Sequence, residues 1–245
     1  MSAAASLRLS DVEAVSFDCY GTLIDWEAGL SRVLMPWARE HQLSLTGEQL
    51  LEVYAECEAQ AEQATPAALY PDILAASMRA VGERLGVAVG DDQARRLAVS
   101  VPDWPAFPDS AAALAELSTR YKLLILSNVD RASFAASNAR LAVRFDAVIT
   151  AQDVGSYKPA PANFAALLER AAELGIGRGR LLHVAQSLFH DHVPAKRAGL
   201  ATVWIDRRRG RSGGGATPPP PEQVQPDWVF ASLTEFAAAC AGETR

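Results

Sequence analysis

The sequence is poor in cysteine, in positive charge and in long apolar runs. Its three cysteines, Cys19, Cys57 and Cys240, are odd in number and widely spaced, which predicts neither a disulfide framework nor a zinc site. With a net charge of −6, the chain lacks the basic excess that binds nucleic acids or anionic membranes. No run reaches membrane-spanning length, and no basic segment precedes a long apolar one near the start. We therefore expect a cytoplasmic protein with reduced thiols that binds neither nucleic acid nor membrane.

The rest of the composition is that of an ordinary globular chain. Its 245 residues, 49% apolar and 21% charged, can form one large domain or two unequal ones. Short β-branched runs alternate with helical patterns, an order that is typical of βαβ connections and parallel sheets. The predicted strands cover residues 12–17, 122–126, 147–150, 181–185, 201–205 and 228–230. We therefore predict an α/β fold with a doubly wound parallel sheet.

Residues 26–102 interrupt this alternation with four helical patterns and no convincing strand. The expected helices cover residues 26–42 with a kink or break at Pro36, a segment that Thr46 and Gln49 open as a capping box, residues 71–85, and a short segment after Asp91. We therefore predict a core domain of residues 1–25 and 103–245 with a helical domain of residues 26–102 inserted. Residues 1–11 are expected to be a loose leader. The arginine-, glycine- and proline-rich residues 207–226 are expected to be a mobile, solvated loop, with contact to an anionic substrate as the less favoured alternative.

The first predicted strand ends at a carboxylate. Asp18 follows the apolar run, and Gly21 lets the backbone turn sharply and bring N–H groups close to a ligand. Ligands of an open parallel sheet bind beyond the carboxyl ends of its strands. Asp18 is therefore a candidate to contact a substrate, and an aspartate that only caps the next element is the structural alternative.

The run Asp-Cys-Tyr-Gly-Thr-Leu at residues 18–23 resembles the first motif of the haloacid dehalogenase superfamily, whose members use this aspartate as a covalent nucleophile. Three further motifs follow in the superfamily's order: Leu-Ser-Asn at residues 126–128, Gly-Ser-Tyr-Lys-Pro at 155–159, and the segment 183–191. The resemblance covers almost the whole chain. It implies a Rossmann-like core with an inserted helical cap domain, and it is compatible with a homodimer.

Tyr20 decides between two branches of that superfamily. In its phosphatases, the residue two positions after the nucleophile is a second aspartate, which protonates the departing alkoxide. A halide ion is a weak base and leaves without a proton, so a dehalogenase needs no acid there. The type II (L-2-haloacid) dehalogenase branch carries tyrosine at this position, as this chain does. A tyrosine that packs under the cap domain is the structural alternative.

The second and third motifs supply polar groups for the same site. Ser127 and Asn128 can donate hydrogen bonds to a substrate carboxylate or to Asp18, and Thr22 is expected to orient both. Lys158 beside a buried carboxylate would keep that carboxylate ionised, as a nucleophile must be. A surface lysine is the alternative interpretation.

The fourth motif bears on the metal. Superfamily phosphatases carry two acids here that serve Mg²⁺, but in this chain Gln186 replaces the first and only Asp191 remains. We therefore expect no metal and no cofactor, with Asp191 and Lys158 activating water and with Gln186 or Ser187 binding substrate. The three histidines at positions 183, 190 and 192 do not have zinc-site spacing, and we expect them around the site or at the surface.

The match to the dehalogenases is incomplete around the substrate. Their cap domain carries an arginine that helps receive the halide, and here Ala55 aligns with it, among Glu52, Glu56, Glu58 and Glu62. Glutamates that faced the site would repel a haloacid carboxylate. Arg32 and Arg79 are the candidates to replace that arginine, and Phe164 stands where the dehalogenases have a tyrosine.

The resulting hypothesis is a hydrolase that cleaves the carbon–halogen bond of small 2-haloalkanoic acids. Asp18 would form an aspartyl ester, and water would release a 2-hydroxy acid, with Tyr20, Trp26 and Trp104 as candidates for an apolar wall. The first alternative is a Mg²⁺-dependent phosphatase with Asp18 and Asp191 as metal ligands. The second is a catalytically silent protein that binds a small ligand or a protein partner.

Overall fold

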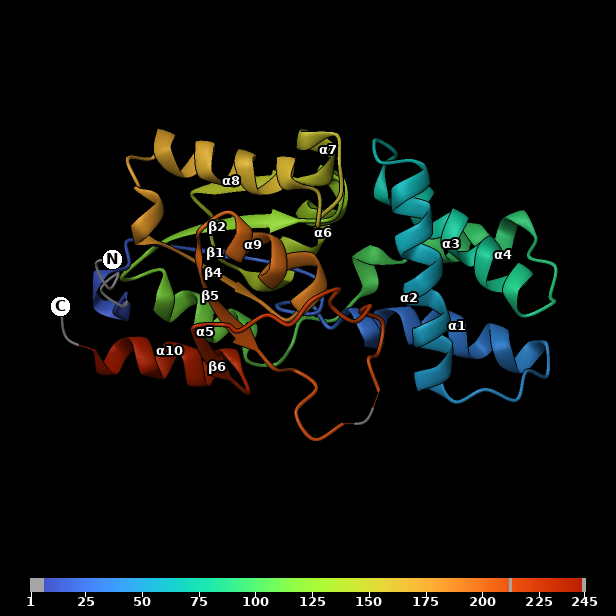
Figure 1. Cartoon of the computed structure of the whole chain (residues 1–245). Helices are drawn as coiled ribbons and strands as arrows, with labels where there is room; N and C mark the ends of the chain where they lie inside the picture. Colours follow the sequence, from blue (N-terminus) through green and yellow to red (C-terminus); the bar gives the residue numbers. More distant parts are fainter. Residues whose placement is uncertain (1–6, 212, 244–245) are drawn as a thin grey trace.

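The computed structural model describes residues 7–211 and 213–243, and a six-stranded parallel sheet forms its centre (Figure 1). The strands are β1 (Ala14–Phe17), β2 (Lys122–Ser127), β3 (Ala147–Thr150), β4 (Leu181–Ala185), β5 (Ala201–Ile205) and β6 (Trp228–Phe230). Their order is β3-β2-β1-β4-β5-β6, and every neighbouring pair is parallel. The chain order reverses beside β1, so the predicted ligand-binding edge lies where β1 ends.

Helices cover both faces of the sheet because alternate strand residues point to opposite sides. Val15 and Phe17 belong to an apolar cluster with α5 (Ser110–Leu117), α6 (Arg131–Leu141) and α10 (Leu233–Gly242). Ala14 and Leu124 belong to a second cluster with α8 (Pro161–Glu173) and α9 (Val193–Arg197). The predicted α/β fold with a doubly wound sheet is confirmed, and a short helix, α7 (Ala151–Val154), is an addition that the sequence did not predict.

Four helices follow β1 and lie together beyond the carboxyl ends of the strands (Figure 1). They are α1 (Trp26–Glu40), α2 (Gly47–Ala64), α3 (Tyr70–Arg84) and α4 (Asp91–Ala98), and we call them the insert. The capping box at the start of α2 is present: Thr46 Oγ1 accepts from the Gln49 amide, and Gln49 Oε1 accepts from the Thr46 amide. Of the predicted kink or break at Pro36, the break is wrong, since α1 continues through it. Buried side chains on both sides, Leu34 and Trp37, hold the helix in place.

The first residues do not form a loose leader as far as the structure describes them. Residues 1–6 of the predicted leader lie outside the described residues, but Leu9–Asp11 form a 3-10 turn with Leu9 buried. The Ser10 amide donates to the Glu243 carboxylate at 3.0 Å, which joins the two ends of the described chain. None of the helices within residues 7–211 and 213–243 is long and apolar enough to cross a bilayer.

The predicted solvated loop is attached to other parts of the chain through residues 207–211 and 213–217, whereas residues 218–226 are partly or fully exposed. Residues 207–211 and 213–217, which we call the strap, run from the core to the insert. Arg207 pairs with Asp109 at 2.9 Å and lies 4.1 Å from the centre of the Phe107 ring. Arg208 pairs with Glu27 at 2.5 Å and also with Glu48, both in the insert. Local composition could not predict this outcome, because the partner acids lie far away in the sequence.

Candidate active site

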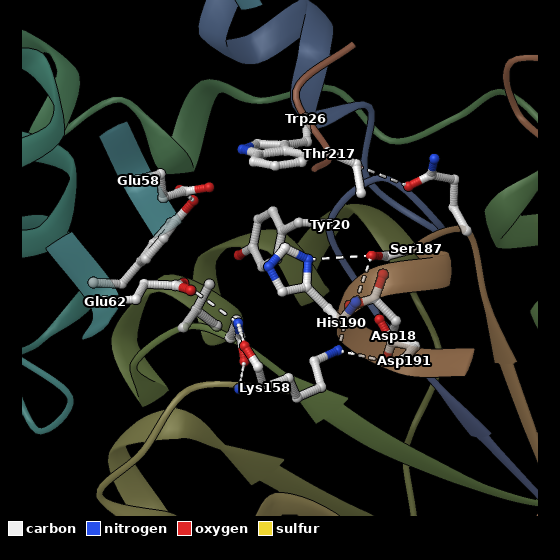
Figure 2. A pocket seen from close by; sticks show the side chains of 14 residues that line it. Asp18, Tyr20, Trp26, Glu58, Glu62, Lys158, Ser187, His190, Asp191 and Thr217 are labelled. Carbon is white, nitrogen blue, oxygen red and sulfur yellow. Dashed lines mark hydrogen bonds and ion pairs between the residues drawn. The ribbon is translucent and has the colours of Figure 1, made fainter. Parts of the chain in front are cut away.

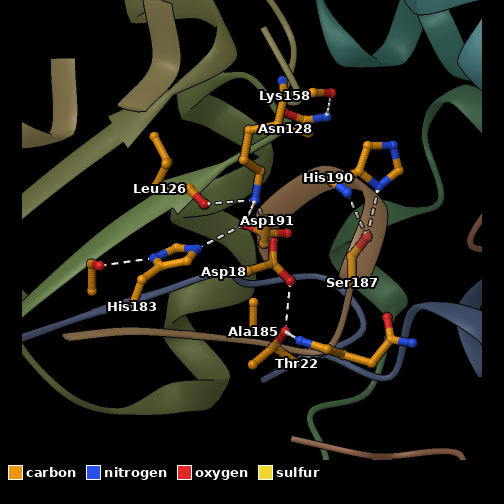
Figure 3. Close-up of polar contacts among 12 residues, drawn as sticks. Asp18, Thr22, Leu126, Asn128, Lys158, His183, Ala185, Ser187, His190 and Asp191 are labelled. Atoms are coloured by element: carbon orange, nitrogen blue, oxygen red, sulfur yellow. Dashed lines mark hydrogen bonds and ion pairs between the residues drawn. The ribbon is translucent and has the colours of Figure 1, made fainter. Parts of the chain in front are cut away.

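A lysine ammonium group joins two carboxylates at the end of β1 (Figure 3). Lys158 Nζ lies 2.9 Å from Asp18 Oδ1 and 2.7 Å from Asp191 Oδ1, and it donates to the Leu126 carbonyl at 3.1 Å. The lysine side chain is only 1% exposed. Three segments far apart in the sequence therefore meet at one buried charge cluster, as the sequence motifs predict for Asp18, Lys158 and Asp191.

The charges in this cluster shift one another's pKa values. Burial alone would lower the pKa of Lys158, but the charges of Asp18 and Asp191 raise it above its ordinary value. Burial would raise the pKa of Asp191, but Lys158 and His183 together bring it well below the usual range. Burial raises the pKa of Asp18, and Lys158 opposes that rise only in part. Asp191 is therefore the more firmly ionised of the two carboxylates.

Thr22 holds the second oxygen of Asp18. Its Oγ1 donates to Asp18 Oδ2 at 2.6 Å and accepts from the backbone N–H of Gln186 at 2.9 Å. Gly21 makes this tight turn possible, because its φ of 92° lies in the left-handed region that favours glycine. Thr22 is fully buried, so it positions the aspartate and does not line the space above it.

Asn128 positions the loop that carries Lys158. Its Oδ1 accepts from the Lys158 amide at 2.6 Å, and its Nδ2 donates to the Lys158 carbonyl at 3.0 Å and to Glu62 at 3.3 Å. Ser127, the last residue of β2, is buried, and its Oγ has no hydrogen-bond partner in the described part of the chain.

His183 is a member of the cluster that the sequence analysis did not assign to it. Its Nδ1 is 2.8 Å from Ser16 Oγ, and its Nε2 is 2.9 Å from Asp191 Oδ1 (Figure 3). Both His183 and His192 are fully buried, so of the two expected places, around the site or at the surface, the surface is wrong for both, and His183 lies beside the site through its contact with Asp191. The register of β1 with β4, which pairs Ser16 with His183, places the serine and the imidazole side by side.

A cavity opens above Asp18, between the core and the insert (Figure 2). It encloses about 430 Å³ of space between atoms, its mouth included. We call it the central cavity, and its lining residues are Asp18, Tyr20, Trp26, Glu58, Glu62, Tyr70, Asn128, Val129, Lys158, Gln186, Ser187, His190, Asp191 and Thr217. Two predicted substrate-binding residues, Thr22 and Ser127, are not among the residues that line it.

The aromatic side of the central cavity is built on Tyr20. Its hydroxyl lies 2.7 Å from Ser137 Oγ and donates to the Ser133 carbonyl at 3.2 Å, so it is engaged in the core. Its ring packs edge-on against Trp104 at 5.5 Å between centroids. Trp26 lines the cavity, whereas Trp104 packs behind Tyr20 and does not line it. Tyr20 therefore contributes its ring to the lining of the cavity, while its hydroxyl is engaged away from it.

Ser187 and His190 form a pair at the rim of the cavity. Ser187 Oγ accepts from the His190 amide at 2.9 Å and lies 3.1 Å from His190 Nδ1. Burial lowers the pKa of His190 to about 4, so the imidazole is neutral at pH 7. His190 was missed as a cavity residue, although its place directly before Asp191 was the available signal.

The insert contributes two glutamates from α2. Glu58 and Glu62 are buried and line the central cavity, while Glu52 and Glu56 of the same helix are exposed. Burial raises the pKa of Glu58 to about 7 and that of Glu62 well above its ordinary value. The four-residue spacing of Glu58 and Glu62 puts both on one face of the helix, but Glu52 and Glu56 have the same spacing, so the sequence alone could not show which pair faces the cavity.

Within residues 7–211 and 213–243, no arginine lines the central cavity where the dehalogenase resemblance leaves a place for one. Ala55 is buried and does not line the central cavity. Arg32 donates to the Asp103 carbonyl, and Arg79 pairs with the exposed Asp91. The expectation that either arginine replaces the missing one is therefore wrong, because each is engaged away from the cavity.

The donor set fits a magnesium ion poorly. Asp18 and Asp191 both give an oxygen to the Lys158 ammonium, which lies between them. Gln186 also lines the cavity, but its side-chain amide is neutral and is a weaker ligand for Mg²⁺ than a carboxylate. Within the described residues, no group of three or more histidine, cysteine or acidic side chains could hold a metal ion.

The sequence and the structure resemble those of known proteins. A family model described as haloacid dehalogenase-like hydrolase matches residues 12–198. An (S)-2-haloacid dehalogenase of Xanthobacter autotrophicus is 30% identical over 204 residues, which cover 80% of this chain and 76% of that protein.

Solved structures show the same fold. The crystal structure of a defluorinating L-2-haloacid dehalogenase has a TM-score of 0.74 at 21% identity, covering 94% of this chain and 96% of that one. An L-2-haloacid dehalogenase from Xanthobacter autotrophicus with chloropropionic acid covalently bound has a TM-score of 0.70 at 22% identity, covering 95% of this chain and all of that one. The chain belongs to the haloacid dehalogenase-like hydrolase family.

Proposed function

We propose that the protein is a hydrolytic dehalogenase in which Asp18 displaces a halide from a saturated carbon of a small halogenated substrate, and the names of the relatives point to 2-haloalkanoic acids as the first class to test. The observation that carries this proposal is the environment of Asp18. Both of its oxygens are held, by Lys158 and by Thr22, and a tyrosine ring stands where a phosphatase needs an acid. A halide leaves without a proton, so a cavity that offers no acid at Tyr20 suits this reaction.

The first step forms an ester. Asp18 Oδ attacks the carbon, the carbon–halogen bond breaks, and the halide leaves with the electron pair of that bond. Lys158 keeps Asp18 ionised for the attack, since the ammonium favours the charged form of the carboxylate. The cavity lies between the core and the insert, and we propose that the insert, within residues 26–102, acts as a cap on the core of residues 1–25 and 103–245 and shields this step from bulk water.

The second step hydrolyses the ester. Water attacks the carbonyl carbon of the esterified Asp18, the product leaves as an alcohol, and the carboxylate is restored. We assign the orientation of that water to Asp191, whose Oδ2 has no partner in the described part of the chain, with Lys158 holding Oδ1. Asn128, Gln186 and Ser187 line the cavity and are proposed to orient the substrate.

The relatives support the proposal. The relatives are named as haloacid dehalogenases, and one solved relative carries covalently bound chloropropionic acid. The phosphatase alternative is less well supported, since the Lys158 ammonium lies between the two carboxylates that would hold Mg²⁺. The silent-protein alternative leaves the buried charge cluster without a role.

We also propose a cytoplasmic location and a homodimer. The first is supported by the three cysteines, which are all free and buried. The second rests on the family resemblance alone, and light scattering of the purified chain tests it by giving the molar mass in solution.

Halide release tests the proposed function. The substrates are chloroacetate, both enantiomers of 2-chloropropionate, 2-chloropropionamide and (2-bromoethyl)trimethylammonium, all in EDTA. The wild-type protein and the control variant Asp72→Asn should release halide from at least one of them, and Asp18→Asn should release none. Equal release by wild type and Asp18→Asn, or no release from any substrate, would contradict the proposal. EDTA-sensitive cleavage of an aryl phosphate instead would favour the phosphatase.

A further inference from the structure

The wall of the central cavity on the insert side is acidic. Figure 2 shows Glu58 and Glu62 on one side of the cavity, with Asp18 and Asp191 on the other. Glu58 Oε1 accepts from the hydroxyls of Tyr54 at 2.8 Å and Tyr70 at 3.0 Å, so this carboxyl group is held in place. The wall that would receive the non-reacting end of a substrate is therefore built from ordered acids.

The charge of the lining opposes an anionic substrate in every protonation state of these glutamates. Lys158 is the only lysine or arginine among the residues that line the central cavity, and it faces two aspartates. With both glutamates protonated, the lining carries a net charge of −1, and with both ionised it carries −3. A haloacid carboxylate adds another negative charge in a poorly solvated space, whereas a cation reduces the excess.

Aromatic faces in the same cavity favour the same kind of ligand. Trp26, Tyr20 and Tyr70 all line it, and ring faces attract ammonium groups. On the opposite side, Asp191 Oδ2, which we assign above to the hydrolytic water, is a buried acceptor with no hydrogen-bond partner within the described residues. The cavity therefore contains aromatic rings and an unpartnered acceptor in addition to the two glutamates.

We propose that Glu58 and Glu62 bind a small ammonium group at the non-reacting end of the substrate, in place of the carboxylate of a haloacid. The inference rests on the proposed function for the reacting end, a carbon–halogen bond that faces Asp18. The glutamates are specificity-determining residues in this scheme and take no part in bond breaking. When ionised, they provide charge complementarity at a place where the resemblance to haloacid dehalogenases leads one to expect an arginine, and a bound cation favours their ionised form.

Isothermal titration calorimetry of the full chain with tetramethylammonium and pivalate, two ions of similar shape and opposite charge, tests the inference. Tetramethylammonium is expected to bind wild type at least about tenfold tighter than pivalate, since ring faces and acids both favour the cation. The variant Glu58→Gln/Glu62→Gln should lose this preference. Its amides keep the acceptor oxygens that Tyr54, Tyr70 and Asn128 use in the wild type. The matched control Glu52→Gln/Glu56→Gln, on the exposed face of the same helix, should keep the preference.

Equal or tighter binding of pivalate by wild type overturns the inference, and this comparison needs no variant to fold. An unchanged preference in Glu58→Gln/Glu62→Gln overturns it as well. Failure of the proposed function has a different signature, namely tight tetramethylammonium binding with no halide release from any substrate. Conversely, Asp18-dependent halide release from 2-chloropropionate without cation binding would remove the inference and leave the dehalogenase proposal in place.

Discussion

The hydrogen bond from Thr22 to Asp18 is the shortest contact that the proposed nucleophile makes. At 2.6 Å, it favours the ionised carboxylate and thereby lowers the pKa of Asp18, against the larger rise that burial causes. Sequence motifs identified Asp18, Lys158 and Asp191, because a strand end and a motif order can be seen along the chain. They did not identify His183, whose bonds to Ser16 and Asp191 depend on the register between two strands.

At this scale, Thr22→Val should shift the acid limb of the pH–rate profile upward. The hydroxyl lowers the pKa of Asp18 and so counters part of the rise that burial causes. Without it, the pKa of Asp18 rises, and on acidification the ionised nucleophile is lost at a higher pH. The measurement is kcat/KM for halide release against pH. Thr202→Val is the matched control, since Thr202 is also buried but its hydroxyl has no partner in the described structure. An unshifted acid limb in Thr22→Val would show that the hydroxyl does not tune Asp18.

The start of helix α2 could be predicted from the sequence, but the side of the helix that faces the central cavity could not. Its capping box was predicted because both partners lie within three residues of each other. Which of its glutamates face the central cavity depends on how the whole helix packs against α1 and α3. Glu58 and Glu62 are buried against the cavity, whereas Glu52 and Glu56 are exposed.

Burial of Glu58 should make the stability of the protein depend on pH. Its pKa rises from 4.5 to about 7 on folding, so the folded chain holds this proton more tightly than the unfolded chain does. The free energy of unfolding should therefore fall as the pH rises from about 4.5 to about 7. At pH 8, Glu58→Gln should be more stable than wild type by up to about 3 kcal/mol. Urea unfolding at pH 5 and pH 8 checks this, with Glu56→Gln as control. An equal effect of the two variants would contradict the account.

At the scale of the whole molecule, the strap holds the insert against the core. Arg208 pairs with Glu27 and Glu48, and the Ala216 amide donates to Glu27 at 3.1 Å. Thr217, next in the chain, lines the central cavity. The alternation of strands and helices predicted the sheet, since hydrophobic period and turn residues are local. The strap could not be predicted, since its ion pairs join segments separated by more than 150 residues.

Loss of Arg208 should therefore weaken the whole molecule. Arg208→Gln is expected to lower the free energy of unfolding by between about 1 and 3 kcal/mol, because charged hydrogen bonds to two partly buried acids are lost. Hydrogen exchange at the Gly215 and Ala216 amides should become faster. Arg209→Gln is the control, since Arg209 is half exposed and its ion pair, at 3.6 Å, is with nearby Asp206. Equal stability of the two variants would show that the strap does not hold the insert in place.

The central claim is that the oxygen of the product alcohol comes from Asp18. A single turnover with enzyme in excess, in water enriched in ¹⁸O, tests it directly by mass spectrometry of the product and of the peptide that contains Asp18. The account predicts an unlabelled product and a heavy-isotope gain in that peptide, because water attacks the ester carbonyl carbon of Asp18. A labelled product with an unlabelled peptide would mean that water attacks the substrate carbon itself, and Asp18 would then not be the nucleophile.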